Sequence, residues 1–419
     1  MKKLLAILLV VLMALPMTAL GDEKVKLEFI QWWAAEAGGE YLPELVKEYE
    51  ALHPNVTIEL LTVPFGETRN QTVTNFATGT SADLIAMNPP WVREFYDLGI
   101  LAPLDDFIAN DSNYDVSLYP AYEPLEGKTY SVPYTQMGFF LFYNVDMFEA
   151  ANIAPPTTWE EMKDAAIKLT NPEKNQYGMS LVLSESSAAN GSILSIYPLL
   201  YAANGRTLQD GKFVANTPEM LKVFQFLDEV QKAGALLPGT TSKAELQVVE
   251  EFGQGNIGMM LEHDGHIITT YKRISESGKD MNFGVIPIPT IDGTGSPDLR
   301  HHGWDIAIAS TSEHKQEAWD FISYITSEEV LNRAAESCGK VPAIKGAAPA
   351  SLVEQYPQYE AAIEYMGTLP MIEELMLMPA SSACWTELTR AGSYVIQGTK
   401  TPEEALVECQ AAWDKILGQ

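Results

Sequence analysis

Near its N-terminal end the chain alternates between strand-like and helix-like segments, which constrains its fold more than any other feature. Residues 25–30 and 56–60 alternate apolar and polar side chains, a pattern typical of half-buried strands. Residues 42–52 carry apolar side chains at helical spacing and end just before Pro54, which cannot continue a helix. Residues 83–87 have the pattern of a buried strand. Because strands separated by helices pair in parallel, this order predicts an α/β fold built on a parallel sheet.

Helical patterns recur along the rest of the chain. Thr158 and Thr401 each precede one of them and are followed three residues later by glutamate, the pattern of a capping box. With 419 residues, the chain is long enough for two or three lobes. It contains no internal repeat or low-complexity linker, so we expect short crossing strands between the lobes. The predicted later helices span residues 158–169, 218–233, 314–326 and 402–417.

The first 21 residues have the pattern of an export signal. Two lysines precede twelve apolar residues, 4–15, and small side chains follow at Ala19 and Gly21. Twelve residues are too few to cross a bilayer, which needs about 20. We therefore expect residues 1–21 to be a signal peptide and the mature protein to be exported. No cysteine lies near the predicted cleavage site, so no lipid anchor is expected.

The charge balance argues against two classes of partner. The chain has 27 lysines and arginines against 56 aspartates and glutamates, a formal net charge of -29. Nucleic acids and anionic membrane surfaces attract basic clusters, and an acidic surface repels them. We therefore expect neither a nucleic-acid partner nor attachment to a membrane surface.

The three cysteines, Cys338, Cys384 and Cys409, are too few and too widely spaced for a zinc knuckle or a disulfide framework. Cys338 and Cys384 can pair in an oxidising exterior, which would leave Cys409 alone. The sequence does not decide between this pairing and three free thiols.

Four of the six histidines fall in two short stretches, residues 262–266 and 301–305, which also contain carboxylates. Imidazole and carboxylate groups are ligands for a metal cation. However, the metalloprotease spacing of two histidines four apart around a glutamate is absent, and Gly265 disfavours a regular helix that presents both. The interpretation that we favour is polar loop residues near a cleft, with no metal and no cofactor.

No sequence motif points to catalysis. The chain lacks a Gly-x-Ser-x-Gly nucleophile elbow, a phosphate-binding loop and a Gly-x-Gly-x-x-Gly turn. Its 56 carboxylates single out no acid–base pair. We therefore expect that the protein is not an enzyme.

Aromatic side chains follow two of the predicted strands. Trp32 and Trp33 come directly after the first strand, and Trp91 follows the strand at 83–87. Parallel strands in α/β sheets deliver such loops to a ligand crevice, where rings stack on the apolar face of a sugar. Glu36 can accept hydrogen bonds from sugar hydroxyls; packing in the core is the alternative role for each ring. Further rings and polar groups in predicted loops are Tyr134, Gln136, Tyr201, Asn204, Trp304, Asp305 and Trp385.

A series of motifs in fixed order resembles extracellular solute-binding protein family 1, the sugar receptors of bacterial ABC importers. The similarity covers essentially the whole mature chain. Two positions depart from the family pattern: His302 replaces the first glycine of a Gly-Gly-Trp segment, and His266 stands near a position that often holds tryptophan. The motifs occupy residues 29–33, 53–56, 77–84, 127–134, 142–148, 155–161, 252–260, 302–304 and 307–308.

The resemblance implies a two-lobed periplasmic-binding-protein fold of the type II kind, with each lobe a sheet flanked by helices and the ligand cleft between them. We expect hinge crossings near Val132-Pro133 and Ile286-Pro287. The expected first lobe comprises residues 22–133 and 287–337, and the second comprises residues 134–286 and 338–419.

The resemblance also implies that the protein is a monomer that captures a sugar by hinge closure and delivers it to the membrane permease of an ABC importer. A neutral mono- or oligosaccharide is favoured, because no cluster of arginine or lysine lies near the strand ends. A metal or chelate receptor on the same scaffold and a secreted carbohydrate-active enzyme remain as alternatives. By matching position, the expected sugar contacts are Trp32, Trp33, Glu36, Trp91, Trp304 and Asp305, followed by Tyr134, Gln136, His263, His266 and Trp385.

Overall fold

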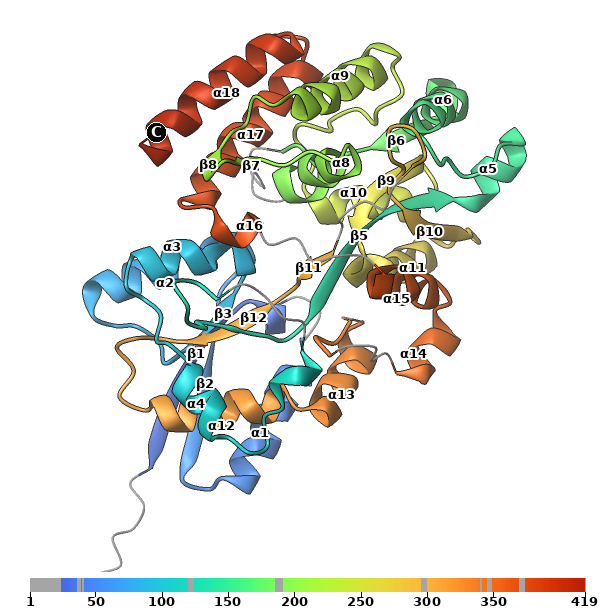
Figure 1. Ribbon diagram of the computed structural model, residues 1–419. Helices are drawn as coiled ribbons and strands as arrows, with labels where there is room; N and C mark the ends of the chain where they lie inside the picture. Colours follow the sequence, from blue (N-terminus) through green and yellow to red (C-terminus); the bar gives the residue numbers. More distant parts are fainter. Residues whose placement is uncertain are drawn as a thin grey trace, which may run out of the picture.

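The computed structural model has two lobes, each built on a five-stranded or four-stranded sheet flanked by helices (Figure 1). The predicted two-lobed α/β fold is therefore confirmed. The predicted signal peptide, residues 1–21, and Glu36 lie outside the described part of the chain. The structure describes residues 24–35, 39, 41–119, 124–184, 191–294, 300–339, 341–344, 349–368 and 374–418.

The first sheet has the strand order β2-β1-β3-β12-β4. Strand β1 pairs in parallel with β2 and β3, as the alternating pattern predicts, whereas β12 runs antiparallel to β3 and β4. Strand β12 lies more than 200 residues beyond β3 in the chain, so no local sequence pattern predicts that the two strands pair. The bounds are Val25–Gln31 for β1, Val56–Thr62 for β2, Leu84–Met87 for β3, Val132–Pro133 for β4 and Asp305–Ile308 for β12.

Helices on both sides of the first sheet complete the first lobe (Figure 1). Helix α1 directs Leu42, Val46 and Tyr49 into the core, because these positions share one face of a helix. Helix α12 buries Trp319 and Phe321 against the same core. These helices are α1 (Tyr41–Leu52), α2 (Phe65–Thr78), α3 (Val92–Asp97), α4 (Asp105–Asn110), α12 (Lys315–Ile325) and α13 (Glu328–Cys338).

The second sheet has the strand order β10-β5-β9-β6, and β11 pairs with the first residues of β5. Strand β5 is antiparallel to β9 and β10, and β9 is buried along its whole length. The bounds are Gln136–Asn144 for β5, Tyr177–Ser180 for β6, Ile257–His263 for β9, Phe283–Pro287 for β10 and Arg300–His302 for β11.

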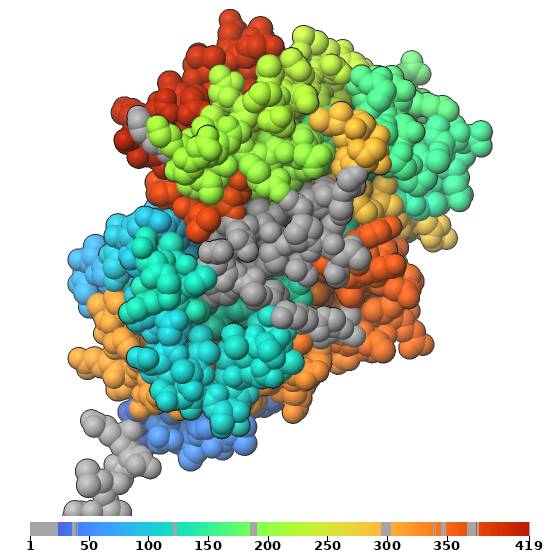
Figure 2. Space-filling model, in the orientation of Figure 1, coloured from blue at the N-terminus to red at the C-terminus, as the bar shows by residue number. Residues whose placement is uncertain are grey.

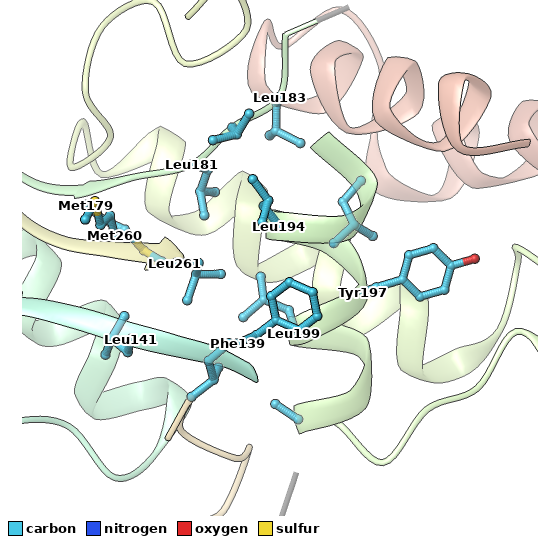
Figure 3. Close-up of a cluster of buried hydrophobic side chains, with 14 of the residues drawn as sticks. Phe139, Leu141, Met179, Leu181, Leu183, Leu194, Tyr197, Leu199, Met260 and Leu261 are labelled. Atoms are coloured by element: carbon cyan, nitrogen blue, oxygen red, sulfur yellow. The ribbon is translucent and has the colours of Figure 1, made fainter. Parts of the chain in front are cut away.

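The core of the second lobe lies between this sheet and the helices above it. Figure 3 shows Phe139 and Leu141 of β5 and Leu261 of β9 facing Leu194 of η6 (Ser192–Ile196) and Leu199 of α8. The helices are α5 (Val145–Ala151), α6 (Trp159–Leu169), α8 (Tyr197–Ala202), α9 (Pro218–Lys232), α10 (Glu245–Gly253), α11 (Ile267–Ser277), α14 (Ala350–Gln355), α15 (Gln358–Thr368), α16 (Glu374–Leu377), α17 (Ser381–Ile396) and α18 (Pro402–Leu417).

The four later helices predicted from the sequence form as α6, α9, α12 and α18, each within two residues of its predicted ends. The capping box before α18 is confirmed: the Thr401 hydroxyl accepts from the Glu404 amide, and Glu404 accepts from the Thr401 amide. The Thr158 hydroxyl likewise accepts from the Glu161 amide. Glu161, however, reaches back to Thr157 rather than Thr158.

Short segments connect the two lobes, and they are hydrogen-bonded to one another. The Tyr134 amide donates to the Trp304 carbonyl at 2.7 Å, and the Gly303 amide donates to the Thr135 carbonyl at 2.8 Å. The chain therefore returns from the second sheet to the first at Gly303 and Trp304, between β11 and β12. The domain boundaries expected near residues 133 and 287 stay a prediction.

A second contact between the lobes lies at the C-terminal part of the chain. Helix α16 packs against α3 and against η2 (Pro89–Trp91), and the Ser381 hydroxyl donates to the Pro90 carbonyl at 2.9 Å. Figure 2 shows this contact as the orange segment that touches the blue N-terminal lobe. Among the described residues, no helix combines the length and apolar character that crossing a membrane requires.

Cys384 and Cys409 are free thiols buried in the second lobe. The pairing of Cys338 with Cys384, which the sequence left open, is therefore not formed. Burial raises the pKa of Cys384 to about 12, so its thiol stays protonated at neutral pH. The Cys338 side chain lies outside the described part of the structure.

Candidate functional site

Five aromatic side chains predicted from separate parts of the sequence come together beside the segments that cross between the lobes. Trp32 and Trp33 follow β1, Trp91 ends η2, and Tyr134 and Trp304 lie in two of the segments that cross between the lobes. Trp32 lies 5.6 Å from Trp91 and 5.9 Å from Trp304, measured between ring centroids. The rings that follow separate strands therefore lie together in the structure, as the sequence analysis expects.

Trp33 is the centre of this aromatic cluster. Its ring is stacked against Tyr134 at 4.6 Å and 11° and against Trp304 at 5.4 Å and 8°. The side chain of Trp33 is 1% exposed, whereas Tyr134 is 5% and Trp304 is 7% exposed. Trp33 is therefore covered by other rings, and Tyr134 and Trp304 are slightly more exposed than Trp33.

Phe65 is a member of this cluster that the sequence analysis missed. It is half-buried at the first position of α2, stacks on Trp91 at 5.5 Å and meets the edge of Trp32 at 5.2 Å. Phe65 follows the end of β2 by three residues, so the rule that singled out Trp32 and Trp33 after β1 applies to it equally.

Asp305 and Gln136 fix the crossing segments. The Ser131 hydroxyl donates to Asp305 at 2.7 Å, and Asp305 is fully buried. The Gln136 amide group donates to the carbonyls of Pro342 and Ile344 at 2.8 and 3.2 Å. Both side chains thus hold neighbouring backbone and side-chain groups in position next to the rings.

His263 and His266 come together with two glutamates, and these four residues are termed the His–Glu cluster. The cluster comprises Glu262 and His263 at the end of β9, His266 in the following turn, and Glu245 at the start of α10. All four ligand atoms lie within 4.8 Å of one another, and Glu262 is fully buried. Sequence spacing missed Glu245, because it reaches the histidines from a different element.

Two predicted residues lie in helices rather than in loops, which corrects that expectation. Trp385 belongs to α17 and Tyr201 to α8, and both are fully buried in the core of the second lobe. The Trp385 ring packs edge-on against Tyr197 at 6.2 Å. All six residues of α8 and most residues of α17 are buried, so neither helix shows the apolar stripe by which sequence periodicity identifies a surface helix. The side chains of His301 and His302 lie outside the described residues.

A groove of about 720 Å³ lies on the first lobe, between α4 and α12. It is lined by Asp106, Asp111 and Asp320, among other residues, and by none of the predicted sugar contacts. The Asp111 carboxylate accepts hydrogen bonds from Ser323 and Trp319. Burial opposes ionisation of Asp111, but these hydrogen bonds lower its pKa on balance. The carboxylate therefore has a structural role, as the acceptor that joins α12 to the end of α4.

Comparison with known proteins gives consistent results. A putative binding protein of Brucella abortus is 25% identical over 385 residues, which cover 90% of each chain. A maltotriose-binding protein of Pyrococcus abyssi is 24% identical over 384 residues, 87% of this chain and 75% of that one.

Among solved structures, an ABC transporter solute-binding protein from Thermotoga lettingae, bound with alpha-D-tagatose, superposes with a TM-score of 0.78. It is 24% identical, and the match covers 94% of this chain and 100% of that one. The family model described as bacterial extracellular solute-binding protein matches residues 33–331. The chain, with its two lobes and its aromatic cluster at their crossing, thus belongs to the bacterial extracellular solute-binding protein family.

Proposed function

We propose that the protein captures a neutral sugar or sugar alcohol between its two lobes and delivers it to the permease of an ABC importer. The observation that carries the proposal is the aromatic cluster at the crossing of the lobes. Relatives named for maltotriose or bound with tagatose support a carbohydrate as the solute.

Aromatic rings suit this role because their faces pack on the apolar C–H face of a pyranose. Trp304 and Tyr134 are the rings that we propose as stacking surfaces, with Trp33 behind them as support. Trp91, Trp32 and Phe65 extend the apolar wall.

The position of Trp304 and Tyr134 links solute binding to closure. Both lie in segments that cross between the lobes, and their backbones are hydrogen-bonded to each other. A solute held there touches both lobes, so it stabilises the closed arrangement by its higher affinity for that arrangement. The permease then distinguishes the closed, loaded receptor from the open one.

A neutral solute fits the charges around the cluster. Asp305 carries a carboxylate, and the whole chain has a formal net charge of -29. A phosphate or carboxylate on the solute would need an arginine or lysine donor to offset this repulsion. We further propose that the protein is exported after loss of residues 1–21 and releases its solute chemically unchanged, as a receptor and not as an enzyme.

The test is a thermal-shift panel of the mature protein against neutral mono- and oligosaccharides, sugar alcohols, sugar phosphates and divalent metals. A ligand present at 100 times its dissociation constant adds about 2.7 kcal/mol to the free energy of unfolding. We expect one class of neutral sugar or sugar alcohol to raise the melting temperature and to be recovered intact. A flat response to every carbohydrate, or cleavage of the bound one, would contradict the proposal.

A further inference from the structure

The His–Glu cluster gathers four metal-ligating groups at one buried point of the second lobe. Glu262 is fully buried, and the side chains of His263 and His266 are 7% and 11% exposed. Glu245 is the most accessible member, with a side chain that is 17% exposed. The four side chains come from the end of β9, the turn after it and the start of α10, so three elements converge here.

The distances within the cluster are too long for strong hydrogen bonds. Glu245 Oε1 lies 3.3 Å from both His263 Nε2 and His266 Nδ1. Glu262 Oε1 lies 3.3 Å from His266 Nδ1 and 3.9 Å from His263 Nε2. An imidazolium that donates to a carboxylate normally approaches to about 2.7–2.9 Å.

Three of these distances match the edges of a coordination tetrahedron. Zinc binds histidine nitrogen and carboxylate oxygen at about 2.0–2.2 Å, so neighbouring ligand atoms of a tetrahedral site lie about 3.3–3.6 Å apart. Three of the four separations above are 3.3 Å. The fourth separation is 3.9 Å, and all four ligand atoms lie within 4.8 Å of one another, so a small inward movement of the side chains would bring them to the spacing of a four-coordinate cation.

The chemistry of the ligand set leads to the same conclusion. Two carboxylates and two imidazoles are oxygen and nitrogen ligands that divalent cations of this class accept. We propose that Glu245, Glu262, His263 and His266 bind one divalent cation of the zinc class. Mixed imidazole and carboxylate ligands in a tetrahedron suit zinc better than calcium or magnesium, which take six or more oxygens.

Binding requires one local change at His263. The Gly265 amide donates to His263 Nδ1 at 3.1 Å, which places the ring proton of a neutral His263 on Nε2. A cation at Nε2 takes the place of that proton, so the ring proton moves to Nδ1 and the contact with the Gly265 amide opens. The amide resonance of Gly265 thus reports binding directly.

The cation would brace the second lobe where it meets the crossing segments. His263 pairs with Phe139 of β5, and the Asp264 carboxylate accepts from the Gly138 amide at 2.7 Å. The cluster therefore lies beside the first residues of β5, the strand that leaves the crossing. This role goes beyond solute capture and does not depend on which sugar is bound.

The experiment uses the untagged mature protein, stripped with a chelator and then titrated with zinc, with metal content measured by mass spectrometry after dialysis. Glu245→Gln keeps the shape of the most exposed ligand and removes its charge. Glu250→Gln makes the same change on the same helix, at an exposed residue that accepts only a 3.3 Å hydrogen bond from Gln254 in the described structure. Sugar binding is measured in parallel, so a failure of solute capture is recognised separately.

We expect one zinc per chain in the unchanged protein and in Glu250→Gln, and at least about tenfold weaker binding in Glu245→Gln. Cobalt in place of zinc should give the visible absorption of a tetrahedral site in the first two proteins and not in the third. Absence of retained zinc in the unchanged protein, or equal affinity in Glu245→Gln, would overturn the proposal.

Discussion

At the scale of single residues, Trp304 has the central place in the account. It lies in a crossing segment, stacks on Trp33, and has the largest exposed fraction of the five predicted rings in the cluster. Replacing Trp304 with alanine removes a stacking surface, so we expect the affinity for the sugar to fall by at least about tenfold. Titration calorimetry with the sugar found in the thermal-shift panel measures this change.

Trp159 supplies the matched control for that variant. It is also 7% exposed, but it lies in α6 and donates to the Pro289 carbonyl, away from the aromatic cluster. We expect Trp159→Ala to lose stability and keep its affinity for the sugar. Equal affinities in the Trp304 variant and the unchanged protein would remove Trp304 from the proposed site.

The residues also show where sequence reasoning about the site succeeds. Trp32, Trp33 and Trp91 follow strands of one sheet, and local pattern is enough to bring such positions to a common edge. Glu245 joins His263 and His266 only because α10 packs beside β9, and no local spacing encodes that contact. Helix α17, which contains Trp385, is buried along much of its length, so the alternation of apolar and polar residues that marks a surface helix is weak there. The sequence pattern therefore predicts a loop at Trp385 where the structure has a helix.

At the scale of elements, the N-terminal cap of α18 tests whether a short sequence pattern stabilises the start of a helix. The Thr401 hydroxyl and the Glu404 carboxylate each satisfy a backbone amide of the first turn. Removing the hydroxyl in Thr401→Ala leaves one amide without its partner, so we expect a loss of about 1 kcal/mol in the free energy of unfolding. Urea denaturation measures it.

Thr386 provides the comparison for this variant. Its hydroxyl donates to the Ser382 carbonyl within α17 and caps no helix end. We expect Thr386→Ala to change the free energy of unfolding by less than about 0.5 kcal/mol. If both variants lost the same stability, the capping explanation would be wrong.

The ion pair between Lys243 and Glu251 links the segment just before α10 to the last turn of that helix. Burial opposes ionisation of Glu251, but hydrogen bonds from Lys243 and Asn256 outweigh it and lower the pKa below the usual 4.5. A carboxyl whose folded pKa is lowered stabilises the fold above its unfolded pKa and loses that contribution as the pH falls through the folded pKa.

We therefore expect Glu251→Gln to be less stable than the unchanged protein at neutral pH, by about 0.5–1 kcal/mol. The difference should shrink below about pH 4 and vanish once the native carboxyl is protonated. Urea denaturation at several pH values measures it, with Glu250→Gln as the control. A difference that stayed constant down to acid pH would show that the carboxylate charge is not its cause.

Most elements follow from local pattern, whereas their assembly does not. The alternation near the N-terminus predicts β1, α1, β2 and β3, and the later helices form close to their expected bounds. The second sheet joins β5 to β9 across more than 100 residues, and β12 completes the first sheet from a still more distant part of the chain. These pairings depend on burial of strand faces in three dimensions, which sequence periodicity cannot specify.

At the scale of the whole molecule, the described residues bring the two lobes together both at the crossing segments and away from them. The crossing segments form one contact, through Tyr134 and Trp304, and helix α16 with Ser381 forms another against η2. In the proposed lobe movement, the crossing segments, which are continuous chain, stay in place and the contact at α16 opens. We propose that rotation about these segments exposes the aromatic cluster to solvent and readmits a solute.

The central claim is that solute capture and lobe closure are one event. Small-angle X-ray scattering of the mature protein, with and without the sugar found in the thermal-shift panel, tests it most directly. We predict that saturating sugar lowers the radius of gyration, and that the Trp304→Ala variant needs at least about tenfold more sugar to reach the same decrease. A sugar that binds tightly to the unchanged protein without altering its radius of gyration would contradict capture by closure.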